Sequence, residues 1–193
     1  HHFHSPIPAD YLNQQTGGGA SPTVAYISSL ITSNSSLSFA PTEYDARWRK
    51  RRIQAEVHDE NACGVGGVAG HAGLFGTADA LAQFGAMWCA HTVPDIAADL
   101  TREATRVHAQ TGDERRGLGW MVRSLGKSTA GTKFGVNSYG HTGFVGNMLW
   151  IDPDQALVVC CLTNNVYYGR GKIGLFEFRV GLNDLIWEAL CSS

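Results

Sequence analysis

The residues best suited to chemistry lie in a small, polar, glycine-rich segment at positions 139–146. It contains His141, Thr142 and Gly143, followed directly by Phe144. A histidine changes its protonation state near neutral pH, so His141 can hold a ligand or protonate it, and the hydroxyl of Thr142 can bind one. Glycine in a strand lets a ligand approach the backbone closely. The pattern therefore predicts a strand along which a ligand lies.

Further strands are expected on both sides of this segment. Residues 147–151 and 156–162 are apolar, and residues 152–155, Asp-Pro-Asp-Gln, are typical of a tight turn between two strands. Residues 117–123 predict one more strand before the segment. Residues 124–137 are rich in Ser, Gly, Thr and Lys and predict an exposed connection.

Three helices are predicted to position these strands. Thr77 should cap a helix whose apolar positions recur at helical spacing, namely Ala80, Leu81, Phe84, Met87 and Trp88. A second helix is expected over residues 94–110, before a polar turn at residues 113–116, and its buried face would carry Ile96, Leu100, Ala104 and Val107. The terminal helix would bury Leu175, Phe178, Leu182, Leu185, Ile186 and Leu190. The order helix, helix, three or four antiparallel strands, helix predicts an α+β fold with helices flanking an antiparallel sheet.

The composition changes near residue 40. Residues 1–40 are rich in Ser, Gly, Thr, Pro and Asn, and only short stretches such as residues 24–27 could pack. We therefore expect a loop-rich arm, or a non-native segment, over residues 1–40. Residues 41–193 are expected to form a globular but partial domain.

The overall composition excludes several classes of protein. The chain has 193 residues, 44% of them hydrophobic, which is enough for a core. A formal charge of −2 argues against a nucleic-acid partner, and no apolar run approaches the length of a membrane span. Five cysteines without a Cys-x-x-Cys pair favour reduced thiols over a disulfide framework or a zinc site. No cofactor is implied, and the compartment stays open because no signal peptide is recognisable.

Two sets of charged residues are interpreted as structural rather than functional. The basic run at residues 47–52 is flanked by acidic residues, so a solvated, salt-bridged face is the simplest interpretation. His58, Asp59, Glu60 and His71 could supply metal ligands. They lack the His-Glu-x-x-His spacing of a helical metal site, so hydrogen bonding within loops is the simpler account.

Three blocks of sequence carry a family resemblance. They are residues 57–62 (Val-His-Asp-Glu-Asn-Ala), residues 66–75 (Gly-Gly-Val-Ala-Gly-His-Ala-Gly-Leu-Phe) and residues 141–143 (His-Thr-Gly). Together they are similar to the carboxy-terminal half of the serine β-lactamase and penicillin-binding-protein superfamily. The branch that they resemble most is that of the class C β-lactamase-like esterases. The resemblance implies the α+β sheet of that superfamily over about residues 40–190, incomplete in this chain.

The resemblance also implies roles for the opening segment. In that superfamily a serine attacks a β-lactam or ester carbonyl and forms an acyl-enzyme, and an oxyanion hole stabilises the tetrahedral intermediate. His141 would position a substrate carboxylate or relay a proton, and Thr142 would offer its hydroxyl to the substrate. Gly143 would let the acyl group approach the backbone. The amide of Phe144 would supply one oxyanion donor.

The nucleophile that the resemblance requires is not recognisable. A Ser-x-x-Lys motif should open a helix upstream, yet the literal match at residues 124–127 falls in a predicted connection just before His141. The Tyr-x-Asn motif has one literal match, at residues 11–13, within the predicted arm. We therefore expect the nucleophile half of the site to be missing from this chain. A second chain or a missing segment would complete it.

Two classes of function follow, and whether the chain acts as an enzyme stays open between them. The first is part of a serine hydrolase that acts on a β-lactam, ester or peptide carbonyl through an acyl-enzyme. His141 would be its catalytic residue, and Thr142, Gly143 and Phe144 would bind the small-molecule substrate. The second is a non-catalytic binding or interaction module derived from the same fold.

Overall fold

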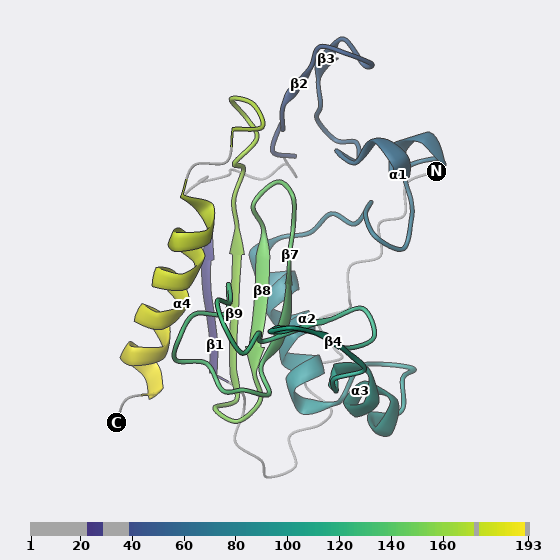
Figure 1. The fold of residues 1–193 in the computed structure, drawn as a ribbon. Helices are drawn as coiled ribbons and strands as arrows, with labels where there is room; N and C mark the ends of the chain where they lie inside the picture. Colours follow the sequence, from purple (N-terminus) through teal and green to yellow (C-terminus); the bar gives the residue numbers. More distant parts are fainter. Residues whose placement is uncertain (1–22, 29–38, 172–173, 192–193) are drawn as a thin grey trace.

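The computed structural model describes residues 23–28, 39–171 and 174–191. Most of the strands in this part of the chain form one sheet. They are β1 (Thr23–Ser28), β4 (Ala109–Thr111), β5 (Glu114–Arg116), β6 (Met121–Val122), β7 (Tyr139–Thr142), β8 (Met148–Asp152) and β9 (Leu157–Leu162). They are arranged in the order β1-β9-β8-β7-β6-β5-β4 (Figure 1). β1 pairs in parallel with β9, and all other neighbours pair antiparallel.

Helices cover both faces of this sheet. The helices are α1 (Glu60–Gly64), α2 (Ala78–Ala90), α3 (Ala98–Thr105) and α4 (Leu175–Cys191). One core cluster of the sheet packs against α2 and the other against α4, so these two helices lie on opposite faces (Figure 1). A small hairpin of β2 (Tyr44–Asp45) and β3 (Arg51–Arg52) lies with α1 beyond one end of the sheet. No helix in the described ranges is long and apolar enough to cross a membrane.

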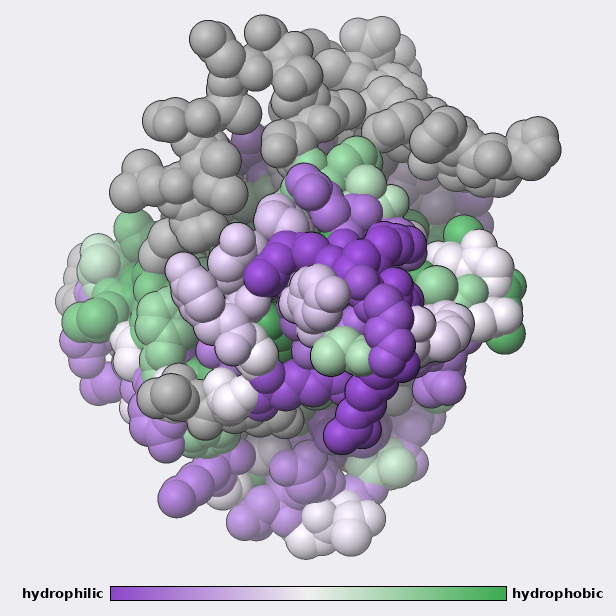
Figure 2. Space-filling model, turned by 90° about the horizontal axis from the view of Figure 1, so that it is seen from above, coloured by the Kyte–Doolittle hydropathy of each residue, from purple (hydrophilic) through white to green (hydrophobic). Residues whose placement is uncertain are grey.

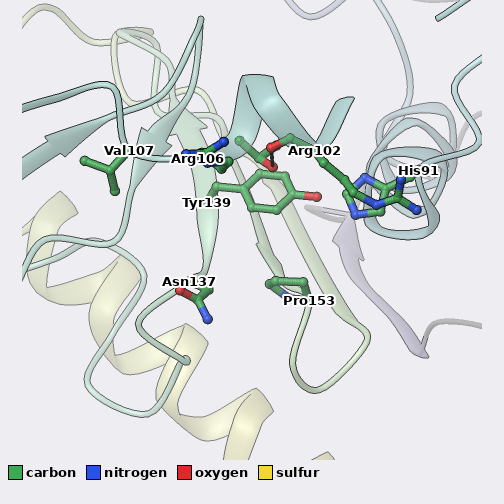
Figure 3. Close-up of a pocket in the computed structure, with 8 residues that line it drawn as sticks. His91, Arg102, Arg106, Val107, Asn137, Tyr139 and Pro153 are labelled. Carbon is green, nitrogen blue, oxygen red and sulfur yellow. Dashed lines mark hydrogen bonds between the residues drawn. The ribbon is translucent and has the colours of Figure 1, made fainter. Parts of the chain in front are cut away.

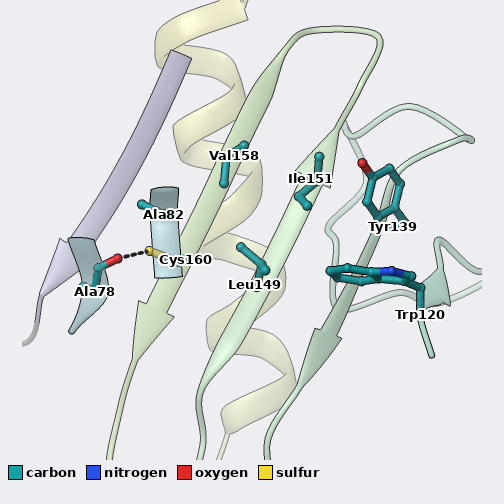
Figure 4. Packing of buried hydrophobic residues seen from close by; sticks show 8 residues of the cluster. All are labelled: Ala78, Ala82, Trp120, Tyr139, Leu149, Ile151, Val158 and Cys160. Atoms are coloured by element: carbon teal, nitrogen blue, oxygen red, sulfur yellow. Dashed lines mark hydrogen bonds between the residues drawn. The ribbon is translucent and has the colours of Figure 1, made fainter. Parts of the chain in front are cut away.

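The face toward α2 is held by alternate residues of the central strands. Leu149 and Ile151 of β8 and Val158 and Cys160 of β9 point to this side, as the two-residue repeat of a strand requires (Figure 4). Trp120 and Tyr139 close one end of the cluster. A Cβ at Gly85 of α2 would lie 2.5 Å from Val158 Cγ1, so the absence of a side chain there lets the helix approach the sheet. As predicted, Thr77 caps α2 by accepting from the Ala80 amide.

The intervening residues of the same strands face α4. Met148 and Trp150 of β8 and Val159 and Cys161 of β9 pack there with Leu182 and Ile186 of the helix. Because both faces of β8 and β9 are covered, these strands are continuous apolar runs rather than alternating ones. The predicted strands, the tight turn between them, the existence of the terminal helix and the α+β class are confirmed. The expected buried face of this helix is partly wrong: Phe178, Leu185 and Leu190 are exposed, because the stripe that faces the sheet runs through Arg179, Leu182, Asn183 and Ile186.

The helix expected over residues 94–110 is much shorter. α3 spans residues 98–105, and Ile96, Leu100 and Val107, expected on its buried face, are exposed; the buried residue is Thr101. The helix ends at Thr105, and the Ala104 carbonyl accepts from the Leu118 amide at 2.8 Å instead of from a further helical residue. A Cβ at Gly117 would be 2.4 Å from this carbonyl oxygen, so the two segments are in close contact. The His108 amide then donates to the Arg116 carbonyl and starts strand pairing.

Two predicted connections also differ from the structure. Residues 113–116 were expected to form a turn, but Glu114–Arg116 is β5, and the turn lies one position earlier, where Gly112 has φ +58. The 117–123 strand is reduced to β6. Residues 124–137 were expected to be exposed, but Ala130 and Phe134 are buried in the cluster beside α4. Their polar neighbours hide these two anchors in the sequence.

The predicted arm lies mostly outside the described residues. Within it, Thr23–Ser28 is a strand that pairs with all six residues of β9. Residues 1–22 and 29–38, which include the Tyr-x-Asn match at residues 11–13, lie outside the described ranges. A domain boundary near residue 40 stays a prediction.

Candidate active site

The strand predicted to bind a ligand has a partly unpaired edge. β7 pairs with β8 along its whole length, from Tyr139 opposite Ile151 to Thr142 opposite Met148. On its other edge, β6 pairs only with Tyr139 and Gly140. Within the described part of the chain, His141 and Thr142 therefore have no strand partner on that side. Such an edge presents backbone N–H and C=O groups to which an extended peptide can add as a further strand.

The four predicted site residues divide between the two sides of this edge. His141 lies on the α2 side, because it follows Tyr139 by two residues and stands opposite Leu149, both of which face α2. Its side chain is exposed, and its Nδ1 lies 3.0 Å from the Thr142 carbonyl oxygen. Thr142, Gly143 and Phe144 instead line one hollow of about 400 Å³ beside the first turn of α4. The structure thus brings three of the four together and sets His141 across the strand from them.

A tight turn holds Gly143 and Phe144 at the end of β7. The Gly143 amide donates to the Asn147 carbonyl at 2.7 Å, and the Gly146 amide donates to the Gly143 carbonyl at 3.1 Å. Gly146 has φ +117, and a Cβ there would lie 2.0 Å from the Thr163 hydroxyl oxygen, so only glycine fits. The turn geometry therefore explains the glycine at position 146.

A buried arginine stabilises the same turn. One Nη of Arg179, in the second turn of α4, donates to the carbonyls of Gly143 (3.2 Å), Gly146 (2.8 Å) and Asn147 (3.2 Å). Burial lowers the pKa of this guanidinium from its ordinary value. Arg179 is not among the residues predicted from the sequence, although a signal was present: it lies on the same helical stripe as Leu175, Leu182 and Ile186, where a charge is unusual.

A polar network connects this turn to the block at residues 57–62. The imidazole of His58 stacks on Phe144 with ring centroids 5.6 Å apart, and its Nε2 lies 3.1 Å from a carboxylate oxygen of Glu43. Arg170 forms ion pairs with both Glu43 and Glu60, and its guanidinium carbon lies 5.4 Å from the centre of the Phe144 ring. Hydrogen bonds from Arg170 hold the pKa values of Glu43 and Glu60 below their usual range. The block at residues 57–62 therefore contacts Phe144, the residue that directly follows the block at residues 141–143.

Acid should loosen this network. Because the pKa values of Glu43 and Glu60 are lowered in the fold, the stability they contribute is present above their ordinary value of 4.5. It is lost as the pH falls through the lowered values. The urea midpoint of the full chain should fall between about pH 6 and pH 3, and Arg170→Gln should make this fall smaller. Arg51→Gln breaks an exposed pair with Glu56 and should leave the pH slope unchanged. An equally steep slope in both variants would contradict the assignment.

The basic run at residues 47–52 forms hydrogen bonds and ion pairs with acidic residues that are close to it in the sequence. Asp45 accepts from the amides of Arg47, Trp48 and Arg49, and Arg51 forms an ion pair with Glu56. The end of the molecule that carries β2 and β3 is hydrophilic at its centre when seen from above (Figure 2). The salt-bridged interpretation of this segment is confirmed for Arg51, whereas Glu43 and Glu60 pair with Arg170 instead.

The residues considered as metal ligands have other partners. Asp59 caps α1 by accepting from the Ala62 amide at 2.8 Å, and its carboxylate lies 3.0 Å from His71 Nε2. His58 and Glu60 belong to the network at Phe144. In the described ranges, no three His, Cys, Asp or Glu side chains are grouped to hold a metal ion.

The literal Ser-x-x-Lys match does not open a helix. Residues 124–127 lie in the connection after β6, and the side chain of Ser124 is buried. This placement agrees with the prediction that residues 124–127 lie in a connection rather than at the start of a nucleophile helix.

Comparison with known proteins identifies the family of this chain. The family model for Beta-lactamase matches residues 29–179, well over half of the chain. The chain belongs to the beta-lactamase family. The match begins within the predicted arm and ends in α4 at Arg179, so the family's domain includes the edge of β7, the turn at residues 143–147 and the network at Phe144.

Individual relatives match part of the chain. It is 37% identical over 123 residues to the N-acetylmuramyl-L-alanine amidase of Bacillus subtilis, covering 60% of this chain and 27% of that protein. It is 33% identical over 122 residues to the "Putative D-alanyl-D-alanine carboxypeptidase" of Escherichia coli, covering 60% and 28%. A crystal structure of a beta-lactamase from Mycobacterium bovis superposes with a TM-score of 0.52 at 21% identity, over 62% of this chain and 46% of that one. The chain spans a little over a quarter of the length of these curated relatives.

Proposed function

We propose that this chain forms the substrate-binding side of a serine hydrolase site that acts on a peptide, ester or β-lactam carbonyl through an acyl-enzyme. The observation that carries the proposal is the unpaired edge of β7 at His141 and Thr142, next to the hollow that Thr142, Gly143 and Phe144 line. The names of the relatives, an amidase and a carboxypeptidase of D-alanyl-D-alanine, favour peptidoglycan peptides as the substrate class.

The substrate would lie along this edge as an added strand. Backbone hydrogen bonds with His141 and Thr142 would orient its reacting carbonyl, and the hydroxyl of Thr142 would hold a neighbouring polar group. Gly143 lets the acyl group approach closely, because it has no side chain, and the amide of Phe144 would stabilise the oxyanion. The serine would come from a Ser-x-x-Lys segment that completes the site.

His141 would act at the other side of the same edge. Its imidazole is exposed, so it can reach a bound substrate and exchange protons with solvent. An imidazole so placed can move a proton to or from the reacting group, a contribution of about 10²–10⁴ in rate for a well-positioned residue. His141 would thus be the catalytic residue that this chain supplies.

The test is acylation of the native protein that carries this chain, or of this chain supplied with a Ser-x-x-Lys-bearing segment. A fluorescent penicillin and a fluorophosphonate report the acyl-enzyme, and a chromogenic ester reports turnover. We expect His141→Ala to lower the rate at least about tenfold, at the low end of proton-transfer effects. His108→Ala is the matched control: this histidine is bonded to the Glu103 carbonyl, away from β7, and its loss should leave the rate unchanged.

Two outcomes would count against the proposal. Full activity of His141→Ala would remove its catalytic role. The absence of labelling by both reagents in every assembly would favour the binding module instead.

A further inference from the structure

A second hollow, of about 390 Å³, lies at the opposite end of β7. Its lining includes Tyr139, which is three residues from Thr142, or roughly 10 Å at the rise of a strand. The other main contributors come from the end of α2, from α3, from the connection before β7 and from the β8–β9 turn, namely His91, Arg102, Arg106, Asn137 and Pro153 (Figure 3). Nothing in the proposed hydrolase chemistry uses this hollow.

The charge around this hollow is positive. Arg102 and Arg106 line it, whereas none of its lining residues is an aspartate or a glutamate. Arg106 pairs with Glu103 at 2.6 Å, but Arg102 has no ion pair within the described residues. Burial and then the positive charge of Arg102 lower the pKa of His91, which indicates that a further positive charge is disfavoured there. The electrostatics of the hollow therefore favour an anion.

A buried hydroxyl in the lining has no partner. Tyr139 is only 2% exposed, and within the described residues its hydroxyl makes no hydrogen bond. The ring is held edge-on against Trp120 at 5.3 Å, and Figure 3 shows the hydroxyl directed toward the side of the hollow where His91 and Arg102 lie. Burial raises the pKa of Tyr139, so the hydroxyl stays protonated and can act as a donor. Buried polar groups are nearly always paired, so this hydroxyl indicates a missing acceptor.

The hydrogen bonds of His91 restrict the class of ligand that could supply this acceptor. Its Nδ1 lies 3.1 Å from the Thr101 hydroxyl oxygen, and this hydroxyl donates to the Ala98 carbonyl at 2.8 Å. The hydroxyl hydrogen is therefore used, so Nδ1 carries the hydrogen and the neutral imidazole keeps an acceptor at Nε2. A ligand with both anionic oxygens and an O–H donor, such as a protonated phosphate group, matches the guanidinium of Arg102, the tyrosine hydroxyl and this imidazole.

We propose that this hollow binds a small phosphate-bearing ligand, held by Arg102, by the hydroxyl of Tyr139 and by the imidazole of His91. The hollow is larger than a phosphate ion, so an organic group can be attached to the phosphate. The guanidinium of Arg102 can donate two parallel N–H bonds to two phosphate oxygens, and the hydroxyl of Tyr139 supplies a further donor.

The test is isothermal titration of the full chain with inorganic phosphate, glycerol 3-phosphate and sulfate at fixed ionic strength. We expect saturable binding of phosphate that exceeds the binding of sulfate, because sulfate has no proton to donate at neutral pH. Arg102→Gln should weaken phosphate binding at least about tenfold. Arg116→Gln, at an exposed arginine paired with Glu114, is the matched control and should leave the affinity unchanged. If glycerol 3-phosphate binds more tightly than inorganic phosphate, the ligand is an organic phosphate, and if inorganic phosphate binds more tightly, the ligand is the free ion. Either result supports the site.

Tyr139→Phe distinguishes a ligand site from a structural role. Because the hydroxyl has no partner, its removal should leave the phosphate-free protein at least as stable, while phosphate binding weakens severalfold. Three results would overturn the proposal: no saturable binding, equal binding of sulfate and phosphate, or a Tyr139→Phe variant that is less stable without phosphate. None of these measurements depends on acylation, so the hydrolase proposal and this one can fail separately.

Discussion

Replacing Gly140 with alanine should lower the free energy of unfolding by about 2–3 kcal/mol, a typical penalty for overpacking a buried site. Gly140 lies in the middle of β7, opposite Trp150. A Cβ at this position would lie 2.2 Å from the Leu149 carbonyl oxygen and 2.7 Å from the Trp150 ring. Neither group can yield easily, because the carbonyl is part of the β7–β8 pairing and Trp150 is fully buried. Urea unfolding of the full chain, followed by tryptophan fluorescence, measures the loss.

The matched control is Gly143→Ala, three residues along the same segment. Its Cβ would meet nothing closer than 3.5 Å, at Asn147 Cβ, so we expect a change in unfolding free energy within about 0.5 kcal/mol. Comparing the two substitutions separates two roles of glycine within residues 139–146. Gly140 makes room for a core tryptophan, whereas Gly143 lies at the hollow. Equal stability losses for both substitutions would show that crowding at Trp150 is not the cause.

Much of the fold could be predicted from local patterns. The apolar runs of β8 and β9, the Asp-Pro turn between them and the capped helix α2 are each specified by neighbouring residues. The failures share a physical cause. The helix expected to reach residue 110 ends where Gly117 lies against it, and Phe134 is buried despite its polar neighbours. Both outcomes depend on contacts between segments distant in sequence, which a local pattern does not contain.

The candidate site also combines features that the sequence predicts with contacts that only the fold shows. Thr142, Gly143 and Phe144 are contiguous, so their presence at one hollow follows from the sequence itself. The stacking of His58 on Phe144 joins positions 86 residues apart, and the ion pair of Arg170 with Glu43 spans 127 residues. No pairing of these charges could be chosen from the sequence, because Arg51 and Arg52 are closer candidates for the same carboxylates. Only the fold shows which arginine reaches them.

Arg179→Met should produce the other large effect, a loss of about 2–4 kcal/mol in unfolding free energy. Methionine keeps most of the volume but offers no donor to the carbonyls of Gly143, Gly146 and Asn147. One guanidinium nitrogen carries two hydrogens, so at most two of these three bonds are fully formed at once, and two lost charge-assisted bonds set the estimate. Part of the loss is offset, because a buried cation no longer has to be desolvated.

The same substitution should also change the site, because these carbonyls define the turn that places Gly143 and Phe144. If the hydrolase proposal holds, acylation by a fluorescent penicillin should fall at least about tenfold, as expected when reacting groups are misplaced by about 1 Å. Arg116→Met, at the exposed pair with Glu114, is the matched control and should change the unfolding free energy by less than about 0.5 kcal/mol. Wild-type stability in Arg179→Met would show that the turn holds itself together without the arginine. A destabilised variant that is acylated at the wild-type rate would keep the structural role of Arg179 and separate the turn from catalysis.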